Sequence, residues 1–279
     1  MKTIFAQWAI PFCLVLTLLL GACGEKKEET GDSGEANNGD TGNTTPSSVS
    51  SLMGGAIQGS PLSLSTEVST FAGGSGDGDS TDGTGTSATF YAPIGITTDG
   101  TNLFVADYYT IRKIVIASGE VTTLAGSGEE GSADATGTSA TFNRPTGITT
   151  DGTNLYVAER SNHTIRKIVI ATGVVTTLAG TAGTSGSNDA TGTSATFNRP
   201  RGITTDGTNL YVAESENHKI RKIVIATGVV TTLAGSGSQG MDDGTGTSAS
   251  FSNPQRVITD GTNLYVTDEE DKGRISKIQ

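Results

Sequence analysis

The chain has 279 residues and a formal net charge of −11, with an isoelectric point near 4.6. An acidic balance of this size argues against nucleic-acid binding and against electrostatic attachment to anionic lipid. The chain contains two cysteines, Cys13 and Cys23. Stability is therefore expected to come from packing, not from a disulfide framework.

Residues 1–22 have the pattern of a signal peptide. Met1-Lys2 precede an apolar run that ends at Leu20 and is shorter than a typical transmembrane helix. Leu20-Gly21-Ala22-Cys23 resembles a bacterial lipobox, which implies cleavage before Cys23 and a lipid anchor on it in the cell envelope. Gly24, where an aspartate would favour the inner membrane, resembles outer-membrane sorting. The alternative is an ordinary secretory peptide with an incidental cysteine.

Residues 23–64 are rich in Gly, Ser, Thr, Asn, Glu and Lys. A segment with so few apolar residues cannot bury enough surface to offset the entropy cost of folding. We therefore expect a disordered tether that connects the lipidated Cys23 to the rest of the chain.

From residue 65 to residue 279 one pattern recurs four times, anchored by prolines spaced 52 to 55 residues apart (Pro93, Pro145, Pro200 and Pro254). In the second unit we expect short strands at residues 147–149, 155–158, 165–170 and 174–178. Asp-Gly and Thr-Gly between β-branched runs are typical of hairpin turns. A tandem array of four-stranded units predicts an all-β propeller of four blades.

The two ends of the array differ in phase. Residues 67–73 match the fourth strand of a unit, as in residues 120–126, whereas residues 274–279 match a third strand with no fourth after it. The pattern therefore predicts that the N-terminal strand completes the last blade and closes the ring. The alternatives are a fragment of a longer ring and an open arc that closes by dimerisation.

The repeated motifs resemble the bacterial NHL-repeat family. The resemblance is carried by Asp-Gly-x-Asn-Leu-Tyr-Val-Ala-Asp/Glu, Ile-Arg-Lys-Ile and Val-Thr-Thr-Leu-Ala-Gly, and the namesake tripeptide is approximated at residues 162–164 and 217–219. It implies a propeller, although family propellers more often have six blades. It says little about function, because one fold hosts many activities.

The connections between second and third strands, and between blades, vary among the repeats and should share one face. Binding residues favour such loops on a rigid scaffold. Four arginines flank the anchor prolines there and are our candidates for gripping a carboxylate, sulfate or phosphate: Arg144, Arg199, Arg201 and Arg256. The structural alternative pairs them with carboxylates at the ends of the second strands: Asp107, Glu159, Glu214 and Asp268.

No catalytic residue, metal or cofactor is expected. His163 and His218, the only histidines, occupy equivalent turn positions, and Asp77–Gly83 lacks the glutamate that a calcium loop of the EF-hand type needs. We expect that acidic loop to be disordered. The resulting hypothesis is a monomeric, non-catalytic scaffold that binds a protein or glycan. The alternative, implied by the family resemblance, is a metal-dependent lyase or lactonase-like hydrolase that uses the central channel.

Overall fold

The computed structural model describes residues 64–74, 78–268 and 273–279. The predicted signal peptide, Cys23 and nearly all of the predicted tether lie outside the described residues. In the described part, no helix is long and apolar enough to cross a membrane.

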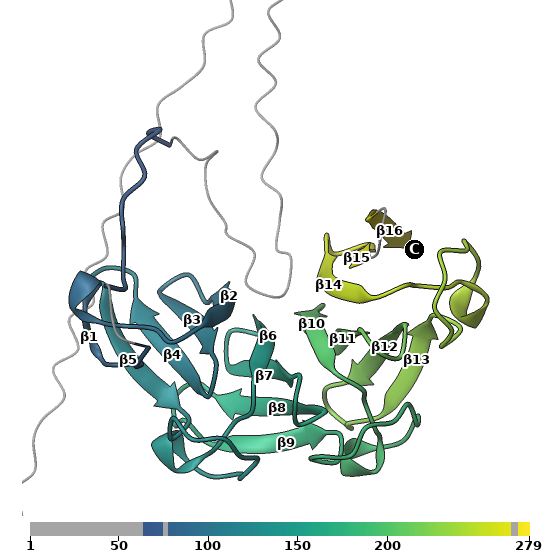
Figure 1. Cartoon of the computed structure of the whole chain (residues 1–279), viewed down its shortest axis with the longest axis horizontal. Helices are drawn as coiled ribbons and strands as arrows, with labels where there is room; N and C mark the ends of the chain where they lie inside the picture. The colour runs from purple at the N-terminus through teal and green to yellow at the C-terminus, as the bar shows by residue number, and fades with distance from the viewer. Residues whose placement is uncertain (1–63, 75–77, 269–272) are drawn as a thin grey trace, which may run out of the picture. The chain divides into compact units, whose positions relative to one another are not determined.

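The predicted array of four β-blades is confirmed (Figure 1). Each of the first three blades has four antiparallel strands in chain order, and the first carries the short β1 (Gly83–Thr84) on its outer edge. Blade one contains β2 (Pro93–Thr98), β3 (Asn102–Asp107), β4 (Thr110–Val115) and β5 (Glu120–Ala125). Blade two contains β6 (Pro145–Thr150), β7 (Asn154–Glu159), β8 (Thr164–Val169) and β9 (Val175–Ala179).

Blade three repeats the order with β10 (Pro200–Thr205), β11 (Asn209–Glu214), β12 (Lys219–Val224) and β13 (Val230–Ala234). Blade four contains β14 (Pro254–Thr259), β15 (Leu264–Asp268) and β16 (Arg274–Ile278). A single turn of 3-10 helix precedes each first strand: η1 (Gly85–Ser87), η2 (Gly137–Ser139), η3 (Gly192–Ser194) and η4 (Gly246–Ser248).

The Asp-Gly turns form because their own side chains satisfy the backbone. In blade two, Asp151 Oδ1 accepts hydrogen bonds from the amides of Thr153 and Asn154 at 2.8 and 2.6 Å. Gly152 has a φ of 86°, a conformation that favours glycine. The hydroxyl of Tyr156 donates to Asp151 Oδ2 at 2.8 Å, which links the turn to the second strand. The Asp-Gly turn recurs in the other three blades, and the tyrosine link recurs in blades three and four, whereas blade one has Phe104 at that position.

Apolar side chains fill the spaces between blades. One cluster joins Phe104, Ala106 and Ile111 of blade one to Ile148 and Leu155 of blade two. The innermost strands β2, β6, β10 and β14 follow one another around the inside of the arc in Figure 1. Gly147 is needed there, because a Cβ atom on it would lie 2.2 Å from the carbonyl oxygen of Arg201 in the next blade. Close approach of neighbouring inner strands therefore depends on glycine.

A buried arginine in the third strand cross-links each of the first three blades. Arg166 Nη1 donates to Glu159 at 2.9 Å, and its Nη2 donates to Asp134 at 2.7 Å. Its guanidinium also lies over the ring of Phe142, 5.1 Å from the centroid. Arg112 and Arg221 occupy the equivalent positions, with Asp107 at 3.6 Å and Glu214 at 2.8 Å.

Blade four replaces this arginine with Ser276 but supplies another from two residues earlier. Arg274 is partly exposed and reaches Asp268 at 3.8 Å and Asp243 at 3.5 Å. All four carboxylates named in the structural alternative are therefore paired with arginines of the third strands. That alternative was wrong about their partners.

The acidic loop before blade one also supplies a carboxylate to a buried third-strand arginine. Asp82 accepts from Arg112 Nη2 and from the hydroxyl of Thr123, both at 2.9 Å. Over its described residues 78–83, the loop therefore has a structural role that the prediction of disorder missed.

The predicted closure of the ring by residues 67–73 is not made in this structure. Within the described residues, the last sheet has three strands, β14-β15-β16. Gly73 and Gly74 instead donate to Gly85 and Ala88 of blade one at 3.1 and 2.8 Å. The physical reason is the arrangement of the blades, which leaves the first and last blades at opposite ends of the arc in Figure 1. Arg256 in β14 also stands where β2, β6 and β10 have glycine for close approach.

A candidate ligand-binding surface on the loop face

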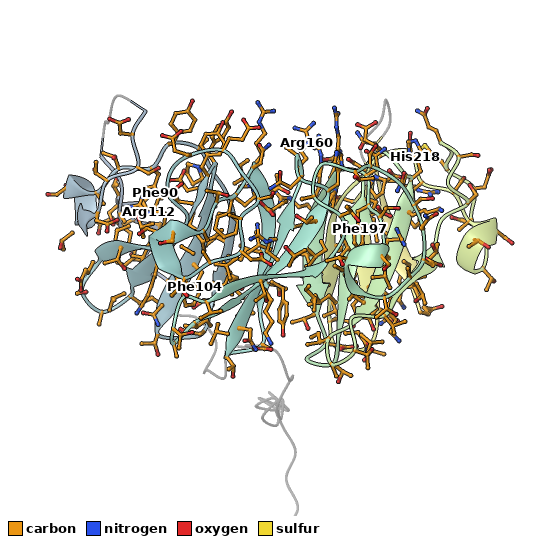
Figure 2. The ribbon with its side chains drawn as sticks, turned by 90° about the horizontal axis from the view of Figure 1, so that it is seen from below. Phe90, Phe104, Arg112, Arg160, Phe197 and His218 are labelled. Carbon is orange, nitrogen blue, oxygen red and sulfur yellow. The ribbon has the colours of Figure 1, made fainter. Side chains whose placement is uncertain are left out.

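The connections between second and third strands lie beside those that join the blades. The amide of Arg160 donates to the carbonyl of Arg144 at 3.1 Å, and the amide of Arg144 donates to the carbonyl of Tyr108 at 3.0 Å. Figure 2 shows Arg160 and His218, from the turns of two different blades, along one edge of the molecule. The structure thus brings the variable connections together on one face.

Local backbone geometry orients two of the predicted arginines. Arg144 and Arg199, each directly before an anchor proline, have φ values of 51° and 52°. Their side chains are exposed. The residue preceding each, Asn143 and Asn198, donates its amide to Glu159 and Glu214 at 2.9 Å. The buried ends of the second strands therefore hold the backbone of these loops, and the arginine side chains are left for the surface.

Four guanidinium groups gather where the loops of blades two and three meet. The pKa of Arg160 is lowered first by burial and then by the positive charges of Arg201, Arg199 and Arg144. Arg199 is paired with Glu216 at 3.1 Å, and Arg201 donates to the side chain of Gln255. Within the described part of the chain, Arg144 and Arg160 have no carboxylate within ion-pair distance. Arg160 was not among the candidate arginines predicted from the sequence.

Blade one adds aromatic side chains to this surface. The ring of Tyr108 lies 4.6 Å from that of Tyr91 and 4.4 Å from that of Tyr109, between centroids. The guanidinium of Arg144 lies over Tyr108 at 5.5 Å, and its Nη2 donates to the Tyr108 hydroxyl at 3.2 Å. This hydrogen bond is the main cause of a lowered pKa at Tyr108. A cavity of about 550 Å³ opens beside the three tyrosines and is also lined by Asp79 and Thr138.

We call these residues together the Tyr-Arg surface: Tyr91, Tyr108, Tyr109, Arg144, Arg160, Arg199 and Arg201. It presents flat aromatic faces and delocalised cations side by side. Such groups bind planar anions through bidentate hydrogen bonds and stacking. They also dominate the energetics of many protein interfaces.

Arg256, the fourth predicted arginine, lies elsewhere. It lines a cavity of about 390 Å³ along the inner strands, together with Ile96, Gly147, Gly202 and Ile258. The structure therefore groups three of the predicted arginines and separates the fourth, which lies along the innermost strands.

The two histidines occupy left-handed turn positions, with φ values of 60° and 53° for His163 and His218. His163 Nδ1 accepts a hydrogen bond from the amide of Arg199 at 3.0 Å. Burial, and then the charge of Arg199, lower the pKa of His163. Among the described residues, His218 Nδ1 is buried without a hydrogen-bond partner. In the same part of the chain, no three His, Cys, Asp or Glu side chains lie close enough together to hold a metal ion.

The fold is an array of β-propeller blades, and part of its sequence is similar to NHL repeat-containing proteins. The human NHL repeat-containing protein 2 is 36% identical over 144 residues, which is 47% of this chain and 20% of that protein. The chloroplastic protein SUPPRESSOR OF QUENCHING 1 of Arabidopsis thaliana is 30% identical over 177 residues, 59% of this chain and 17% of that protein. The chain thus spans about a fifth of the length of these relatives. No family model matches it.

Solved structures with a similar fold share little sequence. A protein of unknown function from Bacteroides thetaiotaomicron is 19% identical, with a TM-score of 0.43, and the match covers 75% of this chain and 74% of that one. An auxiliary nutrient binding protein from the same species is 16% identical, with a TM-score of 0.41 and coverage of 75% and 76%. Virginiamycin B lyase from Staphylococcus aureus is 16% identical, with a TM-score of 0.40 and coverage of 67% and 55%.

Proposed function

We propose that this chain is a non-catalytic binding module of the bacterial cell envelope. Residues 1–22 direct export, Cys23 carries a lipid that anchors the protein in the outer membrane, and residues 23–64 form the tether. The Tyr-Arg surface binds a carboxylate or sulfate group displayed by a protein or a glycan. Because arginine does not release its proton near neutral pH, these side chains suit binding better than proton transfer.

The observation that carries the proposal is the grouping of cations on an acidic protein. The chain has a net charge of −11, yet the positive charges of three other arginines help to lower the pKa of Arg160. Like charges repel one another, so a bound anion would offset a repulsion that the free surface retains. Arg144 and Arg160 are the two guanidiniums most available to an anion. Arg199 is paired with Glu216 and Arg201 donates to Gln255, whereas Arg144 donates to an uncharged partner, the hydroxyl of Tyr108.

The test uses two probes of the same chemistry, a hexaglutamate peptide and a sulfated hexasaccharide. Calorimetric titration of the full chain with each probe should show binding that Arg144→Gln/Arg160→Gln weakens roughly 10- to 100-fold. The matched control is Lys113→Gln/Lys167→Gln, which removes the same charge from half-buried lysines of the third strands. We expect that control to retain most of the affinity.

The two probes distinguish the source of the anion, since a protein partner favours the peptide and a glycan favours the saccharide. The proposal fails if neither probe binds. It also fails if the lysine control weakens binding as much as the arginine variant, because the effect would then be one of net charge alone.

A further inference from the structure

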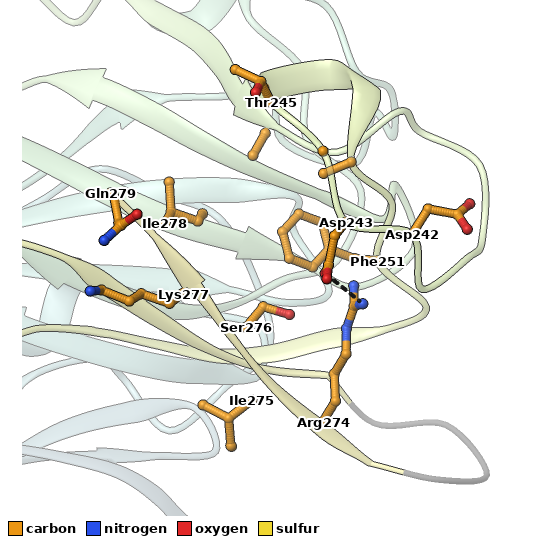
Figure 3. A pocket seen from close by; sticks show the side chains of 14 residues that line it. Asp242, Asp243, Thr245, Phe251, Arg274, Ile275, Ser276, Lys277, Ile278 and Gln279 are labelled. Atoms are coloured by element: carbon orange, nitrogen blue, oxygen red, sulfur yellow. Dashed lines mark ion pairs between the residues drawn. The ribbon is translucent and has the colours of Figure 1, made fainter.

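The described structure has a vacant position beside β16. In the first three blades a fourth strand fills the groove between the third strand and the loop before the 3-10 turn. In blade two, for example, Thr177 of β9 donates its amide and its hydroxyl to Asp134 at 3.0 Å each. In blade four the same groove is an open cavity of about 580 Å³ (Figure 3). Asp243, the equivalent of Asp134, lines it opposite Ser276.

Residues 67–73 carry the sequence of the strand that this groove lacks. Glu67-Val68-Ser69-Thr70-Phe71-Ala72-Gly73 matches Glu120-Val121-Thr122-Thr123-Leu124-Ala125-Gly126, which is β5 and the glycine after it. The C-terminal end of this segment contacts blade one in the same way as the end of a fourth strand contacts the blade that follows it. Gly73 donates to Gly85, and Gly126 donates in the same way to Gly137, both at 3.1 Å. The segment thus has its neighbour on one side and lacks its sheet partner on the other.

Exposed apolar side chains mark both ends of the array. Val68 is 96% exposed, whereas Val121 at the equivalent position of β5 is 1% exposed. Ile96 on the free face of blade one is 63% exposed, against 7% for Ile148. Ile275 on the free face of blade four is 68% exposed, against 0% for Ile220. At the equivalent positions elsewhere, the valine is covered by its own sheet and the loop before it, and the isoleucines are covered by neighbouring blades.

We propose that residues 67–73 of a second copy of this chain fill the groove beside β16. A head-to-tail contact of this kind uses two different surfaces, and it either closes into a ring or continues as a filament. Two arcs of four blades that exchange strands at both junctions make a closed ring of eight, within the range of four to eight blades that propellers adopt. The second copy supplies the strand because Gly73 and Gly74 of a chain are hydrogen-bonded to its own blade one, at the other end of the arc from β16 (Figure 1).

The pairing is specific at the level of residues. In blades one to three the third-strand arginine lies opposite a threonine of the fourth strand, as in Arg166 and Thr177. The equivalent pair across the proposed junction is Ser276 and Thr70 of the second copy. Thr70 would donate to Asp243, and Val68 would enter the position that Val121, Val175 and Val230 fill in the other blades. Arg256 keeps the inner strand β2 of the second copy from approaching β14 as closely as glycine allows elsewhere.

Sedimentation of the full chain tests the association, with a matched pair of variants. Val68 and Leu64 are both highly exposed in the single copy, but only Val68 enters the groove. Val68→Asp should raise the dimer dissociation constant at least about tenfold, because a carboxylate would be buried there. Leu64→Asp should leave the constant unchanged, and Arg256→Gly should lower it. The proposal is overturned if the wild type sediments as a single copy at high micromolar concentration, if the two aspartate variants behave alike, or if Arg256→Gly weakens association.

Disulfide trapping then shows which copy supplies the strand. In a background with Cys13→Ser and Cys23→Ser, Thr70→Cys is placed on one tagged chain and Ser276→Cys on another of different size. Mixing and mild oxidation should give a linked pair of the two chains, whereas Thr153→Cys in place of Thr70→Cys should give none. If the linkage forms only when both cysteines are on the same chain, the strand comes from that chain itself and the proposal is wrong.

Discussion

The buried arginines of the third strands should be the strongest single polar contributions to stability. Arg166→Met removes a guanidinium that has four hydrogen-bond partners: Glu159, Asp134 and the carbonyls of Thr141 and Ala133. Glu159 would remain buried without its counter-ion. Breaking a buried pair in this way costs about 3–5 kcal/mol. Because Glu159 keeps hydrogen bonds from Asn143, Asn162 and Thr164, we expect about 4 kcal/mol.

Blade four offers an internal control for this magnitude. Arg274 is partly exposed, and its ion pairs are longer, at 3.5 and 3.8 Å. Arg274→Met also leaves a buried carboxylate, Asp268, but that group keeps hydrogen bonds from the amides of Ser252 and Asn253, so the cost should be lower, about 2 kcal/mol. Urea unfolding followed by circular dichroism, with the midpoint and the slope both compared, measures the two variants on the same scale.

A double variant separates the loss of the Arg166–Glu159 ion pair from the cost of leaving Glu159 buried without a counter-ion. Arg166→Met/Glu159→Met leaves no buried carboxylate, so it should destabilise the array less than Arg166→Met alone. The reasoning would be refuted if Arg166→Met cost no more than Arg274→Met, or if the double variant were less stable than the single one.

Three further predictions concern the anchor, a histidine and an inner-strand glycine. Cys23→Ser should move the protein from the membrane fraction to the soluble fraction of its bacterial host, and unchanged partition would exclude the lipid anchor. The pKa of His163 is lowered from 6.5 by burial and then by Arg199, so below that pH the unfolded chain binds the proton more tightly and the free energy of unfolding falls as the pH falls. His163→Asn keeps the turn and an acceptor for Arg199, so its melting temperature should depend less on pH between 7 and 5 (~pH 6.5 being the ordinary histidine midpoint); an unchanged dependence would contradict this. Gly147→Ala, which places a Cβ atom 2.2 Å from the carbonyl oxygen of Arg201, should cost about 2–3 kcal/mol. Gly152→Ala, with open space around it, should cost about 1 kcal/mol for its φ of 86° alone, and equal costs would show that the inner strands do not pack as described.

The blades could be predicted from the sequence because their determinants are local. The Asp-Gly turns satisfy their own backbone within four residues, and apolar residues mark the strands between them. The candidate arginines Arg144, Arg199 and Arg201 could be found for a similar reason, since each adjoins an anchor proline whose place in the repeat is visible. Arg160 could have been noticed only by comparing turns, because blade three has Ser215 at that position.

Other features depend on contacts between segments far apart in the chain. Ile-Arg-Lys-Ile places two adjacent charged residues on opposite faces of a strand, and the motif alone does not show which of them is buried. Arg112, Arg166 and Arg221 are buried because loops some 30 residues earlier supply carbonyls and carboxylates to them. The gathering of Tyr91 and Tyr108 beside Arg144 likewise requires two blades to meet. Closure of the ring depends on the angle at which one blade packs on the next. Residues 67–73 match a fourth strand in sequence, but whether they reach β16 is decided by the sum of three blade-to-blade packings, which no local pattern encodes.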